Sequence, residues 1–236
     1  MRKLLGCFYV FSFVSFCAPN VQGQQRYIGV ILGANLANES LDAQPGGVSL
    51  SDRTGILAGV QAERWFSSQW GLSEQLLYAQ EGRDEVINGT GTGSFYGINT
   101  TGNRTIETRY LDVSVLLKKT IWGNNVIRTY AFAGPAVGVF LSGSTHYNSV
   151  SSQNGSTLVT EDTSYSLDSI VNTFDFSILF GAGFSVKLNS GLMLFCDASY
   201  WYGLTNIFES YGGATYTRDI RIAAGVLFPI NMRSLF

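Results

Sequence analysis

Charged residues are scarce in this 236-residue chain, at 14% Asp, Glu, Lys and Arg, where soluble domains average about 25%. The chain also has only 4 prolines, 3 cysteines and 1 histidine, whereas 14% of its residues are aromatic. Few charges with many aromatics exclude a disordered chain. They also exclude a coiled coil or helical bundle, which is rich in Ala, Glu, Lys and Leu. The single histidine excludes metal centres built from several histidines.

The chain has no apolar run long enough for a spanning helix after its first two dozen residues. Residues 1–23 combine a basic start, an apolar run over 4–18 and small residues at 21–23, which predicts a secretory signal peptide. A membrane anchor is the alternative, but the run is shorter than the ~20 residues a spanning helix needs. Lipidation at Cys17 is a further alternative, disfavoured because Phe16 stands where a small residue is required. The predicted mature domain is therefore 24–236.

Cleavage would leave a domain with one cysteine, Cys196, and hence no internal disulfide. It would also remove two of the 15 basic residues, leaving 13 against 17 acidic ones, a net charge of −4. A net negative charge does not provide the basic surface that binds nucleic acid, so we expect no nucleic-acid partner.

Alternation of apolar with small or polar residues predicts strands with two unlike faces. It is clearest at 173–188, where every even position from Phe174 to Leu188 is apolar, and it recurs toward the C-terminus. The same pattern predicts eight strands, near 26–37, 54–66, 71–82, 108–121, 127–141, 173–188, 191–204 and 216–230. Pro135 interrupts the fifth strand and predicts a β-bulge there.

The connections between these strands alternate in length. Short turns are expected at 67–70, 122–126 and 189–190, and long polar loops at 38–53, 83–107, 142–172 and 205–215. Bacterial outer-membrane barrels have short periplasmic turns and long extracellular loops. The order predicts an all-β, eight-stranded, antiparallel up-and-down transmembrane β-barrel with four long extracellular loops and three short periplasmic turns.

The sparse polar face carries isolated charges of both signs, which we expect to fill the interior as an ion-pair network. These charges are Glu63, Asp112, Lys118, Asp175, Lys187, Asp197, Asp219 and Arg221. The alternative is a secreted β-sandwich with the charges in water, but eight charges would make a poor water-facing surface. Aromatic girdles are typical of membrane barrels. Two are expected here, one of Trp65, Phe66, Trp70 and Trp122 and one of Tyr200, Trp201, Tyr202 and Tyr216.

Five segments in order resemble the PorT-like outer-membrane β-barrel family of Bacteroidetes-type bacteria. They lie at 29–36, 71–80, 109–118, 130–135 and 202–207. The resemblance implies a small outer-membrane barrel, with one namesake of the family serving protein secretion, and it supplies no catalytic motif. Glu74, Gln75 and Ser114 depart from the family pattern. The end of the last strand resembles a barrel-assembly signal, with Phe228 and the terminal Phe236 as alternative recognition residues.

No catalytic, cofactor-binding or metal-binding residue is predicted. His146 lies beside Ser142 and Ser144 in the third long loop, but a serine nucleophile also needs an orienting carboxylate, which the spacing does not supply. The acidic loop residues Glu161, Asp162 and Asp168 lack metal-ligand spacing.

The predicted function is a structural or interaction role through the long loops of a cell outer-membrane protein. Two alternatives remain open. One is an accessory subunit of a secretion or envelope complex, and the other is a rim hydrolase that uses His146 on lipid or ester. The expected partners are outer-membrane lipid, the barrel-assembly machinery and envelope or secretion-complex proteins.

Overall fold

The computed structural model describes residues 25–37, 39–41, 48–90, 98–154, 156–208 and 214–230. Every regular element in these ranges is a β-strand. The strands are β1 (Gln25–Ala37), β2 (Glu39–Leu41), β3 (Val48–Trp65), β4 (Trp70–Thr90), β5 (Ile98–Gly123), β6 (Ile127–Gln153), β7 (Ser156–Ser166), β8 (Phe174–Lys187), β9 (Met193–Gly203) and β10 (Thr215–Pro229). No helix in the described part of the chain is long and apolar enough to cross a membrane.

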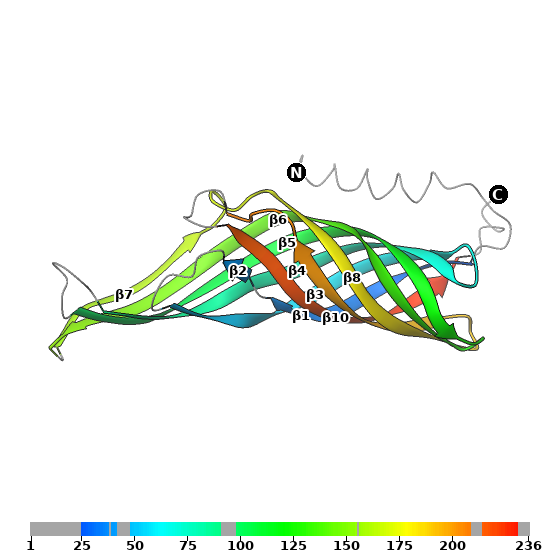
Figure 1. Cartoon of the computed structure of the whole chain (residues 1–236), viewed down its shortest axis with the longest axis horizontal. Helices are drawn as coiled ribbons and strands as arrows, with labels where there is room; N and C mark the ends of the chain where they lie inside the picture. Colours follow the sequence, from blue (N-terminus) through cyan, green and yellow to red (C-terminus); the bar gives the residue numbers. More distant parts are fainter. Residues whose placement is uncertain are drawn as a thin grey trace.

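Eight of the strands close into a ring in the antiparallel order β1-β3-β4-β5-β6-β8-β9-β10. Closure is made by β1 with β10, which pair from Tyr27↔Pro229 to Leu36↔Ile220. The predicted eight-stranded barrel is thus confirmed, and Figure 1 shows it as the tilted, closed part of the sheet. Two strands lie outside the ring, since β2 pairs with β10 and β7 pairs with β6.

The apolar face of each strand points out of the barrel, as the alternation predicts. Along β8 the even positions from Phe174 to Phe184 are exposed, and Phe180 keeps 46% of its surface. Asp175, Ser177 and Leu179, from the other face, are buried inside. The same division holds on β10, where Ile220, Ile222 and Phe228 are exposed and the intervening Asp219, Arg221 and Leu227 are buried.

Three of the predicted long loops, 38–53, 83–107 and 142–172, are wrong as irregular segments over most of the residues that the structure describes. The three short turns are present, but β4 continues to Thr90, β5 begins at Ile98 and β6 continues to Gln153. Within 83–107 the described residues, 83–90 and 98–107, are therefore sheet, and so are most of 142–172 and the described residues of 38–53. Thr, Val and Ile, which favour strands, are interspersed with polar residues there, and each extension pairs with its neighbour. The predicted signal peptide, 1–23, lies outside the described residues.

The predicted bulge at Pro135 is also wrong. β6 pairs with β8 through Pro135↔Ile178 with no change of register. On its other side, pairing with β5 is interrupted between Ser114↔Ala136 and Leu117↔Ala133 and then resumes in the same register. Proline has no N–H to donate to a ladder, so the chain loses local pairing without inserting a residue.

Two of the tryptophans expected in the aromatic girdles instead lie inside the barrel. Trp65 and Trp201 are both buried. Each indole N–H donates to a buried carboxylate, from Trp65 to Glu63 at 2.5 Å and from Trp201 to Asp175 at 3.2 Å. Phe66, Trp70 and Trp122 remain exposed at the short-turn end, and Tyr202 remains exposed toward the long-loop end.

Candidate functional site

One group of buried charges lies in the half of the barrel nearer the short turns. The Lys118 ammonium donates to Glu63 at 2.6 Å and lies 4.2 Å from the centre of the Tyr130 ring. The Tyr130 hydroxyl in turn donates to Asp197 at 2.6 Å. Four strands supply these side chains, so the group ties together opposite walls of the barrel.

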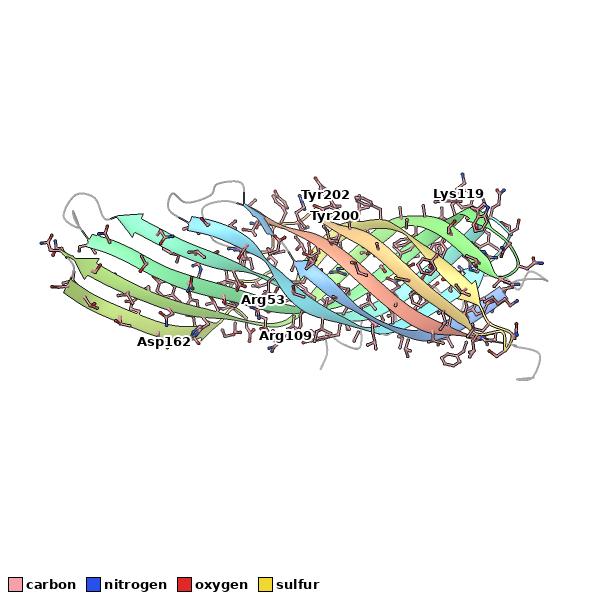
Figure 2. All side chains as sticks on the ribbon, turned by 90° about the horizontal axis from the view of Figure 1, so that it is seen from below. Arg53, Arg109, Lys119, Asp162, Tyr200 and Tyr202 are labelled. Carbon is pink, nitrogen blue, oxygen red and sulfur yellow. The ribbon has the colours of Figure 1, made fainter. Side chains whose placement is uncertain are left out.

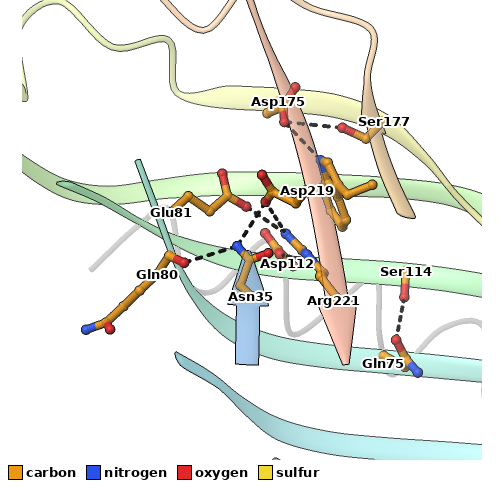
Figure 3. A network of polar contacts seen from close by, with 11 residues as sticks. Asn35, Gln75, Gln80, Glu81, Asp112, Ser114, Asp175, Ser177, Asp219 and Arg221 are labelled. Carbon is orange, nitrogen blue, oxygen red and sulfur yellow. Dashed lines mark hydrogen bonds and ion pairs between the residues drawn. The ribbon is translucent and has the colours of Figure 1, made fainter. Parts of the chain in front are cut away.

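A second group, the mid-barrel cluster, comprises Asn35, Glu81, Asp112, Asp175, Asp219 and Arg221 (Figure 3). Arg221 donates to Asp112 at 2.7 Å and to Glu81 at 2.6 Å. Its guanidinium also stacks 4.0 Å from the centre of the Trp201 ring. Asn35 joins the cluster by donating to Asp219 at 2.9 Å. Arg221 is 3% exposed, so this single cation organises several carboxylates in a water-poor interior.

The expected interior network is correct for seven of its eight charges. Lys187 is the exception, because it lies at the very end of β8 and is exposed. Glu81 is an interior charge that the sequence did not identify. It lies in the third predicted strand, whose faces are ambiguous because small residues occupy both of them.

The long-loop end of the barrel is closed by an apolar cap. Ile106 and Tyr110 on β5 pack there against Leu167, Val171, Ile207 and Phe208 from the segments that follow β7 and β9. Backbone contacts join the two segments, since Val171 bridges Phe208 and the Asn172 N–H donates to the Ile207 carbonyl at 2.9 Å. With the two charged groups below it, the cap leaves an interior filled by side chains.

Beyond the cap the sheet continues as an open projection, which we call the blade. It consists of residues 48–52, 83–90, 98–107, 144–153 and 156–166, paired in that order. Figures 1 and 2 show it extending from one side of the barrel, with Asp162 on the blade and Lys119 at the opposite end of the molecule. Every residue of β7 is exposed.

Ion pairs stiffen the base of the blade. On its outer face, Arg53 donates to Glu107 at 3.0 Å and pairs with Asp84 at 3.4 Å, while Arg109 donates to the same Glu107 at 2.6 Å. On its inner face, Glu85 accepts from Arg83 at 2.7 Å and pairs with Arg104 at 2.6 Å. The blade is thus joined to the barrel by continuous ladders and by two charge networks.

His146 lies on the blade, and the structure gives it a serine partner other than the two expected. Its Nδ1 lies 2.9 Å from the hydroxyl of Ser164, directly across β6 and β7, and its Nε2 lies 3.6 Å from Asp162. The imidazole is 54% exposed. The three side chains therefore lie on the surface of the blade, where water competes for their hydrogen bonds.

The acidic residues of the blade do not form a metal site. Among the residues that the structure describes, no group of three or more His, Cys, Asp or Glu side chains could hold a metal ion. Glu161 and Asp162 are consecutive on β7 and so point to opposite faces of the sheet.

A family model described as outer membrane protein beta-barrel domain matches residues 22–209. The chain belongs to this outer-membrane β-barrel family. The exposed apolar wall therefore faces the lipid of the outer membrane, the short turns are periplasmic and the blade is extracellular.

Solved outer-membrane barrels are similar to this chain over most of its length. Ail of Yersinia pestis, solved with the heparin analogue sucrose octasulfate, is 13% identical, with 86% of this chain and 99% of Ail covered and a TM-score of 0.38. Neisserial surface protein A is 13% identical, with 86% and 97% covered and a TM-score of 0.41. A major outer-membrane protein of Thermus thermophilus is 14% identical, with 87% and 99% covered and a TM-score of 0.41. No curated protein sequence matches this chain.

Replacing the central cation of the mid-barrel cluster should destabilise the barrel strongly. Arg221→Met leaves Glu81 and Asp112 buried without their cation, so we expect the free energy of unfolding to fall by about 3–5 kcal/mol. Arg109→Met is the control, because Arg109 is 43% exposed and its pair should contribute less than about 1 kcal/mol. Urea unfolding in phospholipid vesicles, followed by tryptophan fluorescence, measures both. Equal losses for the two variants would contradict the assigned role of Arg221.

A charge on the lipid-facing wall should also be costly. Phe180 lies near the middle of β8 on the outer face, so Phe180→Arg should lower the free energy of unfolding in a bilayer by about 2–4 kcal/mol. Ser177→Ala on the inner face of the same strand removes one hydrogen bond to Asp175, at about 1 kcal/mol. The same unfolding measurement in vesicles tests both. A smaller cost for Phe180→Arg than for Ser177→Ala would show that the faces are reversed.

Proposed function

We propose that this protein is a non-enzymatic outer-membrane interaction protein that binds an extended segment of a partner along the outer edge of β7. One observation carries the proposal, namely that all 11 residues of β7 are exposed and that β7 pairs with β6 alone among the described strands. Natural proteins protect such edges by keeping them short, by placing charged residues, lysine above all, or proline on them, or by a bulge. β7 spans 11 residues and contains neither Lys nor Pro; its only charged residues are Glu161 and Asp162, and its pairing with β6 shifts register once, between Ser151 and Ser152.

Addition of a partner strand to this edge would use the backbone groups of β7. In such complexes the main-chain hydrogen bonds give affinity, and the alternating side chains give specificity. Glu161 and Asp162 place one carboxylate on each face of β7, so a partner strand carrying cationic residues matches the edge. The charge networks at the base of the blade hold the edge in place before a partner binds. They favour binding because less conformational entropy is then lost on association.

We further propose that the chain is a PorT-like member of its family, exported by the signal peptide at 1–23. The five ordered segments described above support this assignment. Phe228 is exposed on the outer wall at the end of β10, which supports it as the residue that the barrel-assembly machinery recognises, whereas Phe236 lies outside the described residues. The partner at β7 would then belong to an envelope or secretion complex, with the barrel as its accessory subunit.

Site-specific photo-crosslinking in the native host tests the edge proposal. With benzoylphenylalanine at Thr163 of β7, we expect a discrete covalent adduct with one envelope protein. The matched control is the same probe at Asn103, which lies in β5 within the interior of the blade. Loss of the Thr163 adduct on substituting Thr160→Pro would support strand pairing. Equal adducts from both positions, or none from Thr163, would contradict it.

A rim hydrolase is the second candidate, favoured by the approach of His146 to Ser164 and Asp162. We expect purified protein with His146→Ala or Ser164→Ala to hydrolyse a chromogenic short-chain ester at the wild-type rate, because the arrangement is exposed to water, which competes for its hydrogen bonds. A fall in kcat of about 100-fold or more in both variants would instead assign a catalytic pair.

A further inference from the structure

Arg218 places a positive charge on the outer wall of the barrel. It occupies an even position of β10, and the even positions of this strand form the outer face, as the exposed Ile220 and Phe228 show. The side chain is partly exposed. Asp219 is the only acidic residue of β10, and it is buried inside the barrel, where it lies 3.5 Å from Arg221. No carboxylate of β10 therefore accompanies Arg218 on the outer face.

Two tyrosine rings and two backbone carbonyls hold the guanidinium of Arg218 in place. It lies 3.9 Å from the centre of the Tyr202 ring, directly across the pairing of β9 with β10, and 5.4 Å from the centre of the Tyr216 ring. Its Nη1 donates to the carbonyls of Gly203 and Thr217, both at 2.7 Å. These hydrogen bonds use one nitrogen. Nε and Nη2, which form one edge of the guanidinium, have no acceptor in the described part of the chain.

The charge of Arg218 is not neutralised by any ion pair with the residues that the structure describes. The other arginines of the mid-barrel cluster and of the blade and its base each pair with at least one carboxylate, namely Arg53, Arg83, Arg104, Arg109 and Arg221. A charge on the lipid-facing surface of a barrel is destabilising, and ionisable residues at membrane depth mark functional sites. We therefore expect an anion from outside the chain to bind at Arg218.

The depth of Arg218 in the membrane identifies this anion. The outer positions of β10 are all apolar from Phe228 to Ile220, a stretch about as long as the 9–11 residues that a tilted strand needs to cross a bilayer. Arg218 follows this stretch directly on the extracellular side, between Tyr202 and Tyr216, and Figure 2 shows Tyr202 on the outside of the barrel. Tyrosine is enriched at the membrane–water interface. Arg218 is therefore at the headgroup level of the outer leaflet, which in bacterial outer membranes is built largely on lipid A, a phosphorylated glucosamine disaccharide.

We propose that Arg218, Tyr202 and Tyr216 form a binding site for a phosphate group of lipid A. The free edge of Arg218, Nε with Nη2, donates to two phosphate oxygens, a bidentate contact for which the guanidinium is suited. The carbonyls and tyrosine rings fix this edge before the lipid binds, so little entropy is lost on binding. The exposed Ile178, which pairs with Tyr202, and Ile220 contact the acyl chains. The proposal rests on the outer-membrane assignment and is independent of binding at β7.

Native mass spectrometry of the full chain in detergent micelles tests the site. Bisphosphorylated lipid A is added at increasing concentration, and the lipid that remains bound is counted. We expect Arg218→Gln to lower the affinity about fivefold, since a basic residue near an anionic lipid surface contributes about 1 kcal/mol. Dephosphorylated lipid A should bind the wild type and this variant equally. Arg109→Gln is the matched control, because it removes an outer-face arginine that already pairs with Glu107 at 2.6 Å.

Two further measurements distinguish a lipid site from a structural role and from a site for a soluble anion. Tyr202→Leu keeps an apolar side chain toward lipid but removes the stacked ring, so the affinity for lipid A should fall about two- to fivefold. Inorganic phosphate in tenfold excess should not displace the lipid. A heat-dependent mobility shift on a detergent gel confirms that each variant is folded.

An unchanged affinity in Arg218→Gln, or an equal loss in Arg109→Gln, would overturn the proposal. So would an equal loss with dephosphorylated lipid A, which would show that Arg218 serves only to join the carbonyls of Gly203 and Thr217. Displacement of the lipid by inorganic phosphate would assign the site to a soluble anion instead.

Discussion

The hydrogen bonds between β1 and β10 are the constraint on which the rest of this structure depends. A bilayer offers no water to unpaired N–H and C=O groups, so a sheet within it must close on itself. Ten consecutive residue pairs, from Tyr27↔Pro229 to Leu36↔Ile220, make that closure between the first and last strands of the ring. Because the closing strands are at opposite ends of the described chain, neither face of the barrel exists until nearly the whole domain has been assembled.

Closure separates two surfaces with opposite requirements. The outer wall exposes apolar side chains such as Ile178, Phe180 and Ile222, which lipid accepts without cost. The inner wall collects charges that must pair with one another, because breaking a buried pair leaves an uncompensated ion. Arg221 and Lys118 each bind carboxylates supplied by other strands, so their pairs tie together strands that are distant in sequence. Above the membrane neither requirement applies, and the sheet continues as a polar blade.

The period-two pattern predicted much of this architecture, because a strand between lipid and a filled interior must alternate strictly. It correctly assigned Asp175, Asp197 and Arg221 to the interior.

The pattern failed where the position of a side chain depends on a hydrogen-bonding partner from another part of the chain, which the sequence alone does not reveal. Trp65 and Trp201 are aromatic residues near strand ends, as girdle residues are, but their indole N–H groups donate to buried carboxylates inside the barrel. Residues 83–107 and 142–172 were expected to be loops because they are polar, yet cross-strand pairing extends β4 to Thr90, β5 from Ile98 and β6 to Gln153. The proximity of His146 to Ser164 likewise depends on the register of β6 against β7, which the sequence does not specify.

The orientation of the two faces is tested most directly by spin labels placed along β8. With Cys196 replaced by alanine, single cysteines at consecutive positions from Ser177 to Gly183 carry a nitroxide in phospholipid vesicles. The account predicts an alternation of period two, with labels at Ile178, Phe180 and Ala182 relaxed by oxygen dissolved in the lipid and labels at Ser177, Leu179, Gly181 and Gly183 protected from it. Relaxation of the even positions by a water-soluble nickel complex, or the absence of alternation, would contradict a barrel with lipid outside and a polar interior.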